Sequence, residues 1–422
     1  MRRIISISSG KGGVGKTTFA INFALSLSRV APTILIDLDT GTSSVRNTID
    51  TPVTKDLYHF FRKGARLSEC LTTLDQRLDP GGRFTNFAFV AGPRHVIDEI
   101  TNMREEARWR LLQAINELDA RFIVLDLKAG LDANVIDYLP LSNSGILVFT
   151  PHHPAATLAA GDIVKSLLFR KLRFIFAEGS PFFGPDGDRQ HQAMITELLD
   201  QVEDVYDERL LNLDAFMIDL YEALGENPYL HAISDVLNSF GVFFVLNMFD
   251  GIEESYQTTI RPFVEYLRTS VSSKLHLTNL GWVVHDRQIH EANCQRRPIL
   301  LQTPSRKERS VDAIRREIAS LESSVLGLED PRLSDSRTPA TIRDELIRID
   351  PSCTVERQLE ILQQMYHSHG QQRVRENFAY ITHRALHVMQ HLPPDSFGHP
   401  RLFSPLEIFD QLMPERPAGT PA

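Results

Sequence analysis

Residues 8–18, SSGKGGVGKTT, place four glycines and two lysines in one short stretch of chain. The pattern GxxxxGK[ST] is met by Gly10, Gly15, Lys16 and Thr17. Glycine reaches positive φ and lets backbone N–H groups approach an anion closely, a lysine neutralises phosphate charge, and a hydroxyl binds Mg²⁺. The spacing therefore predicts a P-loop, with Lys16 on the β- and γ-phosphates of a nucleotide and Thr17 on Mg²⁺.

The elements that must position this loop are short apolar strands that alternate with segments of helical period. A strand before the loop and a helix after it suit a P-loop, because the helix N-terminus adds partial positive charge near the phosphates. Strands separated by helices predict an α/β fold, with a mostly parallel sheet, helices on both faces, and ligands at the carboxyl ends of the strands. The expected strands are residues 3–8, 33–39, 121–130, 144–151, 241–249 and 280–286.

A P-loop needs only Lys16, so the second lysine, Lys11, needs a separate explanation. The stretch KGGVGKTT resembles the KGGxGKT[TS] signature of the MinD/ParA family of deviant Walker ATPases. The resemblance implies ATP and Mg²⁺ as cofactors, a homodimer in the ATP state, and a Lys11 that reaches the phosphates bound by the other subunit. A cation supplied in this way stabilises the transferred phosphoryl group and couples hydrolysis to dimerisation. The alternative for Lys11 is a solvated surface lysine. The implied nucleotide-binding residues of the loop are Gly10, Lys11, Gly12, Gly13, Val14, Gly15, Lys16, Thr17 and Thr18.

Two aspartate-containing stretches extend the resemblance to the chemical step. IDLDTG at 36–41 resembles the family's switch I, which implies that Asp37 lies near Mg²⁺ and that Asp39 orients the attacking water. IVLDLKAG at 123–130 resembles switch II, which implies a water-bridged Mg²⁺ contact for Asp126 and γ-phosphate sensing by Gly130. The implied metal ligands are Thr17, Asp37 and Asp126, and the implied catalytic residues are Lys11, Lys16 and Asp39.

The nucleoside side of the site follows from two later stretches. VLNMF resembles the family's adenine-binding strand end and gives that role to Asn247, and LGWVVHDRQIHEANCQRRPILL implies a nucleotide contact for Asp286. Departures from the family pattern are Leu127 and Lys128 in switch II, Ser44 after switch I, and Val284 in place of a proline. They bear on the rate of hydrolysis more than on binding. Lys128 is open to either a carboxylate partner or the nucleotide.

The chain divides by composition into an ATPase domain at 1–327, a linker rich in Pro, Ser and Asp at 328–341, a helical C-terminal extension at 342–413 and a disordered tail at 414–422. Within the first domain, an acidic segment at about 188–236 has helical period and predicts an inserted pair or trio of helices with a small core of their own, facing a partner protein. Residues 163–176, IVKSLLFRKLRFIF, favour a core-packed helix followed by a strand over a partner-binding surface.

Charge and composition exclude several other classes of protein. The net charge of -9 argues against a globally basic nucleic-acid binder. Nonspecific DNA binding through the basic residues around 296–316 is possible but not favoured, because acidic residues interleave with them. Three scattered cysteines support neither a disulfide framework nor a metal cluster, and they suit a reducing cytoplasm. No apolar run is long enough to span a membrane, and the acidic, proline-broken end does not read as a direct membrane anchor. His383, His387 and His391 favour a polar helix face over a metal site.

These features together indicate an ATPase that hydrolyses ATP to ADP and phosphate and acts as a spatial switch recruiting an unidentified protein partner. One alternative is a nucleotide-gated scaffold or regulator with little turnover. A less favoured alternative is a metabolic ligase on the same fold, which would need a substrate pocket that the sequence does not identify. Measured turnover separates the first two readings, and a small-molecule co-substrate would mark the third.

Overall fold

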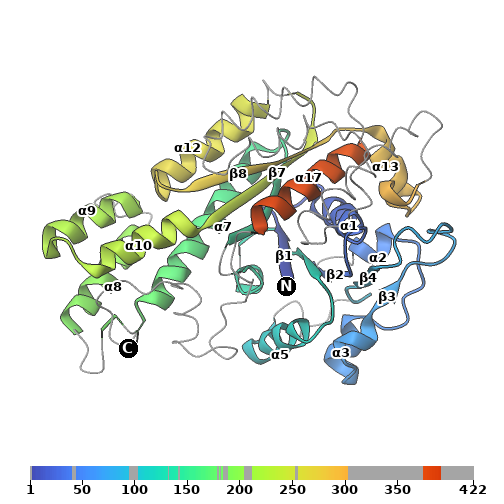
Figure 1. Ribbon diagram of the computed structural model, residues 1–422, viewed down its shortest axis with the longest axis horizontal. Coiled ribbons are helices and arrows are strands. Elements are labelled where there is room, and N and C mark those ends of the chain that lie inside the picture. Colours follow the sequence, from blue (N-terminus) through green and yellow to red (C-terminus); the bar gives the residue numbers. More distant parts are fainter. Residues whose placement is uncertain are drawn as a thin grey trace, which may run out of the picture.

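The computed structural model describes residues 2–39, 44–94, 103–131, 133–140, 143–177, 180, 182–183, 189–203, 212–251, 255–302 and 374–390 (Figure 1). The predicted linker, the tail, most of the C-terminal extension and residues 40–43 of switch I lie outside these ranges.

An eight-stranded sheet forms the centre of the molecule, with strand order β3-β4-β2-β5-β1-β6-β7-β8. Every neighbouring pair is parallel except β3 and β4, which confirms the expected mostly parallel α/β fold. The strands are β1 (Arg3–Ser8), β2 (Thr33–Leu38), β3 (Thr72–Thr73), β4 (Phe87–Val90), β5 (Phe122–Leu127), β6 (Asn143–Phe149), β7 (Gly241–Phe249) and β8 (His276–Val284). All six expected strands are present; β3 and β4 were not anticipated, and β8 begins earlier than expected.

Side chains alternate between two apolar cores along each inner strand, as the two-residue period of a pleated strand requires. Ile4 belongs to one core, whereas Ile5 and Ile7 belong to the other. Likewise Ile34 and Leu35 point to opposite cores. Because both faces are covered, β1 and β2 are buried at every residue.

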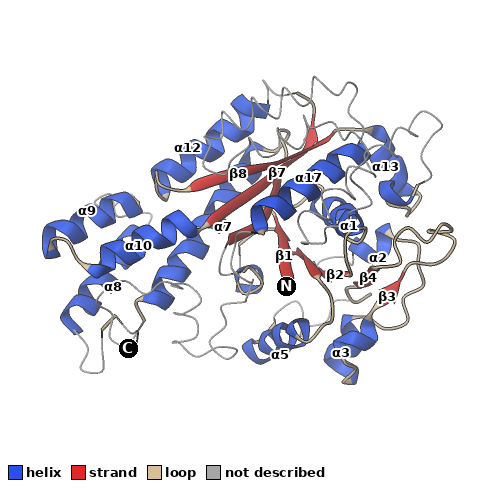
Figure 2. Ribbon diagram, viewed as in Figure 1, coloured by secondary structure: helices blue, strands red, loops and turns tan. Residues whose placement is uncertain are grey.

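Helices cover both faces of the sheet (Figure 2). One core contains residues of α3 (Leu57–Lys63), η1 (Leu67–Cys70), α5 (Glu105–Asn116), α6 (Ala133–Ile136), α7 (Pro154–Ile175), η2 (Tyr256–Ile260) and α12 (Arg261–Ser270). The other contains residues of α1 (Lys16–Leu27), α2 (Ser44–Thr48), α13 (Arg287–Cys294), η3 (Ile299–Leu301) and α17 (Val374–Met389). None of the helices in the described part of the chain combines the length and apolar character needed to cross a membrane.

The acidic insertion forms three helices between α7 and β7: α8 (Arg189–Glu203), α9 (Leu213–Leu224) and α10 (Pro228–Ser239). In Figure 1 they lie at the opposite end of the molecule from α2 and α13. Their buried residues, including Leu199, Phe216 and Val236, belong to the same core as α7 and the sheet. The expectation of a separate small core is therefore wrong, because the apolar face of these helices continues the apolar face of α7.

Residues 163–176 were expected to form a helix and then a strand. The helix is present and core-packed, but α7 runs without interruption to Ile175 and residues 176–177 form a turn. The cations in this stretch are compatible with one long helix because several have partners: Arg170 pairs with Asp137, and Arg173 with Asp200 at 2.7 Å and with Glu203. The strand expectation is thus corrected.

Helix α17 is the described part of the C-terminal extension, and it packs between β8 and α1. The ring of Phe378 lies 5.9 Å from that of Phe19 on α1, and the Asn377 side chain accepts a hydrogen bond from Val284 N at 3.1 Å. A Cβ on Gly281 would lie 3.0 Å from Ile381. Extension residues therefore complete the core beneath the helix that follows the P-loop.

Candidate functional site

The glycines of residues 8–18 let the loop after β1 fit tightly between neighbouring elements. Gly13 and Gly15 adopt positive φ values of 83° and 79°, and Gly15 is the N-cap of α1. A Cβ on Gly10 would lie 2.5 Å from the backbone nitrogen of Ala160 on α7, so this position admits only glycine without a shift of α7. The loop therefore presents backbone N–H groups and the N-terminus of α1 in the geometry of an anion site.

Lys16 carries the positive charge at the centre of this site. Its side chain is only 6% exposed; its ammonium forms an ion pair with Asp126 and lies 3.7 Å from Asp39 Oδ2. Asp37 of β2 and Asp126 of β5 are register partners, and Asp126 is also opposite Ile7 of β1. The parallel sheet thus gathers carboxylates and lysine at the carboxyl ends of three neighbouring strands, as the sequence predicted.

Burial disfavours the charged forms of the two aspartates at the centre of the site. Burial and the neighbouring Asp126 raise the pKa of Asp37 to about 7, although Val45 N donates to its carboxylate at 3.2 Å. Burial likewise raises the pKa of Asp126, against the attraction of Lys16 and a hydrogen bond from Thr17. Asp126 Oδ2 is buried and has no hydrogen-bond partner. An oxygen-only donor set with an unpaired buried carboxylate oxygen fits Mg²⁺, so Thr17, Asp37 and Asp126 are suitable ligands.

Lys11 differs from Lys16 in its exposure to solvent and in its lack of side-chain partners in the described part of the chain. It is exposed, and within the described ranges its side chain has no ion-pair or hydrogen-bond partner. Gly12 and Gly13 beside it are exposed, with no other atom within 4 Å of an added Cβ. Gly130 N donates to Ser9 O at 2.8 Å, so the end of switch II is tied to the start of the loop. The loop tip is therefore open to solvent while its base is fixed.

The residues predicted on the nucleoside side lie on the adjoining strands. Asn247 is buried and donates from its side chain to Val14 O at 2.8 Å, so it holds the P-loop from β7. Met248, next to it, has a positive φ of 55°. Asp286 caps α13 by accepting from Gln288 N at 2.8 Å. Their contacts with adenine or ribose remain predictions.

Sequence reasoning missed one contact of the loop helix. Asn293 of α13 donates to Thr18 Oγ1 at 3.1 Å, so this residue of the predicted nucleotide-binding loop is also held by α13. No local motif marks Asn293; only the packing of α13 beside α1 reveals the contact.

The basic residues considered for DNA have structural contacts where they are described. Arg296 pairs with Asp50 at 3.0 Å, and Arg297 donates to the carbonyls of Leu301 and Leu78. The remaining basic residues of this run, from 306 to 316, lie outside the described ranges, as does His391. These contacts favour a structural role for Arg296 and Arg297.

A family model described as CobQ/CobB/MinD/ParA nucleotide binding domain matches residues 5–372. The chloroplastic septum site-determining protein MinD homolog of Arabidopsis thaliana is 33% identical over 172 residues, 39% of this chain and 50% of that protein. The septum site-determining protein MinD of Synechocystis sp. is 30% identical over 183 residues, 41% of this chain and 66% of that protein. The chain spans about half to two thirds of the length of the curated relatives it matches. Among solved structures, MinD from Pyrococcus horikoshii complexed with Mg-ADP aligns with 71% of this chain and 87% of that one, at a TM-score of 0.40 and 16% identity.

Proposed function

Because the chain belongs to the CobQ/CobB/MinD/ParA nucleotide-binding family, we propose that it is an ATPase that binds ATP with Mg²⁺ at the P-loop and dimerises in the ATP state. The observation that carries this proposal is the buried Lys16, held between Asp126 and Asp39 at the end of β1. A buried lysine beside two carboxylates and a helix N-terminus is arranged for phosphoryl chemistry rather than for stability alone.

The roles of the residues follow from their positions. Lys16 exchanges its carboxylate partners for phosphate oxygens, and Asp39, which is partly exposed, orients the attacking water. Thr17, Asp37 and Asp126 would hold Mg²⁺, which neutralises charge on the β- and γ-phosphates when bound. Gly130 senses the γ-phosphate. Its backbone hydrogen bond to Ser9 joins switch II to the loop.

Dimerisation is supported by the surface beside the loop. Lys11 is exposed and unpartnered within the described ranges, so its ammonium is available to a second subunit. Leu131, which follows Gly130, and Leu158 of α7 are each 45% exposed. Leu158 lies between Ala156 and Ala160, whose backbones cover Gly10. Apolar side chains beside an exposed lysine suit an interface that closes over the nucleotide.

We propose that the cycle of ATP binding, dimerisation and hydrolysis serves to position a cellular structure. This role is in line with the septum site-determining proteins to which the chain is similar. The acidic helices α8–α10 face away from the loop and are proposed to bind the protein partner in the cytoplasm. Ile218 and Tyr221 of α9 are 59% and 57% exposed and lie on one helix face, which gives a partner an apolar anchor.

The experiment that tests the ATPase proposal is phosphate release at increasing protein concentration with saturating ATP and Mg²⁺. A reaction that needs Lys11 from a second subunit gives a rate per chain that rises with protein concentration until the dimer saturates. A rate per chain that stays constant over a hundredfold range of concentration would contradict catalysis across a dimer. No release above background would favour the nucleotide-gated scaffold instead.

A further inference from the structure

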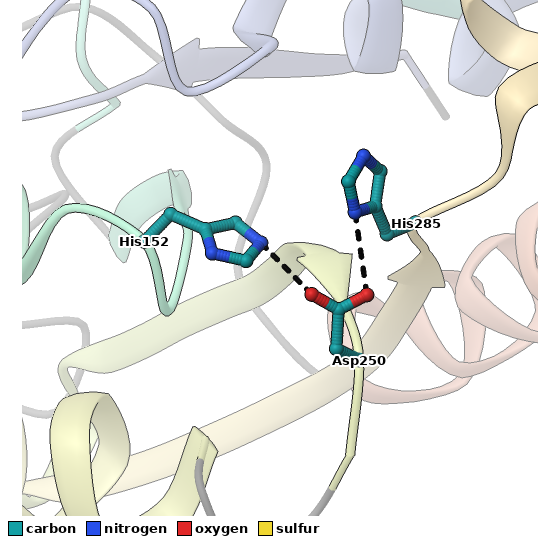
Figure 3. A group of neighbouring side chains, drawn as sticks. All are labelled: His152, Asp250 and His285. Atoms are coloured by element: carbon teal, nitrogen blue, oxygen red, sulfur yellow. Dashed lines mark ion pairs between the residues drawn. The ribbon is translucent and has the colours of Figure 1, made fainter.

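Three side chains meet at the carboxyl ends of the last three strands of the sheet, outside the P-loop and its aspartates (Figure 3). His152 follows β6, Asp250 follows β7 and His285 follows β8. Because β6, β7 and β8 are neighbours in the sheet, residues that are about 100 positions apart and 35 positions apart in sequence come together. The order of the strands in the sheet therefore brings these three side chains together.

The three side chains face one another. His152 Nε2 lies 3.0 Å from Asp250 Oδ2, and His285 Nδ1 lies 3.3 Å from Asp250 Oδ1. The imidazole rings are 5.6 Å apart between centroids, and the ligand atoms of all three residues lie within 4.8 Å of one another. Figure 3 shows the carboxylate of Asp250 placed between the two rings, with one oxygen toward each.

The backbone at this cluster is fixed on a rigid base. His285 N donates to Phe249 O at 3.0 Å, and His152 N donates to the Thr150 hydroxyl at 3.4 Å. The ring of Phe249 stacks on that of Trp282 at 4.8 Å, which joins the ends of β7 and β8. Side chains held directly after strand ends are positioned more precisely than side chains on a long loop.

We propose that His152, Asp250 and His285 form a binding site for a divalent transition-metal ion of the zinc class. Two imidazoles and one carboxylate are the donors that Zn²⁺ and similar ions prefer, whereas Mg²⁺ prefers oxygen ligands alone. Ligand atoms 3.0–3.3 Å apart suit bonds of about 2.0–2.2 Å to a common ion after a small rotation of the carboxylate. To bind the metal, each ring presents an unprotonated nitrogen: a neutral imidazole moves its proton to its other ring nitrogen, and an imidazolium releases one proton to water.

The exposure of the three side chains indicates an open metal site and not a closed structural one. The side chains of His152, Asp250 and His285 are 45%, 46% and 58% exposed, so the ion keeps coordination positions open to solvent. Three protein ligands with open positions distinguish such a site from a closed structural one. The ligands belong neither to the P-loop nor to the Mg²⁺ set, although His285 is next to Asp286, so the titration is done without nucleotide.

The test is a calorimetric titration of the full chain with Zn²⁺ in a chelator-buffered solution. The parent is a Cys294→Ser variant, because Cys294 Sγ lies 3.6 Å from His290 Nε2 and that pair offers a competing site. The expected result is one Zn²⁺ per chain, with affinity reduced tenfold or more by each of His152→Gln, Asp250→Asn and His285→Gln. His153→Gln, an exposed histidine beside the cluster, is the matched control and leaves the affinity unchanged.

A second readout separates lost ligation from lost folding. Co²⁺ in place of Zn²⁺ gives visible absorption bands that report nitrogen and oxygen ligands, and the bands should weaken in the three cluster variants at an unchanged melting temperature. Equal affinity of the parent and all three variants, or an equal loss in His153→Gln, would overturn the proposal.

Discussion

Two buried lysines in different regions of the protein, Lys16 and Lys171, differ in whether carboxylates lie beside them. Lys16 at the P-loop is 6% exposed and has Asp126 and Asp39 beside it. Lys171 on α7, near the inserted helices, is 4% exposed, and within the described ranges no carboxylate lies within ion-pair distance. Its ammonium lies 5.1 Å from the centre of the Phe240 ring. Burial alone lowers the pKa of Lys171 to about 7.

The presence or absence of carboxylate partners distinguishes a lysine that serves binding from one that only packs in the core. A buried cation with carboxylate partners stays charged and can exchange those partners for a phosphate chain. A buried cation without them is costly to keep charged and contributes little except its apolar stem. Substitution of Lys16 should therefore change binding, and substitution of Lys171 should change stability.

The largest effect is expected for Lys16→Ala. The loop would lose the cation that faces the phosphates, and ATP affinity should fall by at least about 100-fold, close to 3 kcal/mol. Calorimetric titration with ATP and Mg²⁺ measures this, and Lys11→Ala is the control that should keep its affinity. Unchanged affinity in Lys16→Ala would remove the P-loop assignment.

Asp39→Ala should separate binding from chemistry in the same region. Asp39 contacts Lys16 only at 3.7 Å and is partly exposed, so its loss should change ATP affinity by less than about threefold and slow phosphate release by about 100-fold. Asp50→Ala, which removes an exposed carboxylate paired with Arg296, is the control for a nonspecific charge effect. Wild-type turnover in Asp39→Ala would show that another group orients the water.

Lys171→Met should stabilise the fold by about 2 kcal/mol at neutral pH, because the ammonium no longer needs to be desolvated. The pKa of Lys171 is near 7 in the folded protein and near its ordinary 10.5 in the unfolded chain, so the unfolded chain binds more protons between these values. Wild-type stability therefore rises with pH from about 7 to 10.5, and the advantage of Lys171→Met shrinks over the same range. Urea unfolding at pH 7 and pH 10 measures this; an advantage that grows with pH would contradict the assignment.

The smallest effect concerns two exposed apolar residues on different helices. Leu158→Glu should weaken the ATP-state dimer by about tenfold, close to 1.4 kcal/mol, because a charge would enter the interface beside the loop. Ile218→Glu on α9 should leave the dimer unchanged. Sedimentation with ATP and Mg²⁺ compares the two, and equal weakening would place the interface elsewhere.

The parts of this site that could be predicted from the sequence are those marked by local motifs. The P-loop was recognisable because its glycines and Lys16 lie close together in the chain, and Asp126 because it lies near the end of an apolar strand. Strand β4 is only four residues long, Phe87–Val90, which is shorter than each of the six strands that were expected. The shared core of α7–α10 depends on which apolar faces meet, and sequence periodicity does not contain that information.

The histidine cluster shows the same limit at longer range. The histidines at 383, 387 and 391 attracted attention because they share a helical spacing. His152, Asp250 and His285 have no spacing in common, and only the order of β6, β7 and β8 brings them together. The available signal was that His152 and Asp250 each follow the end of an expected strand, and that His285 lies near the end of another.

The central claim is that Lys11 acts across an ATP-dependent dimer while Lys16 acts within its own subunit. Light scattering on Asp39→Ala with ATP and Mg²⁺ should give the mass of a dimer, since ATP is bound and hydrolysed slowly. Adding Lys11→Ala to that variant should return the mass to 47.8 kDa, that of one chain, with ATP still bound. A double variant that dimerises as well as Asp39→Ala alone would show that Lys11 is an ordinary loop lysine and would contradict the account.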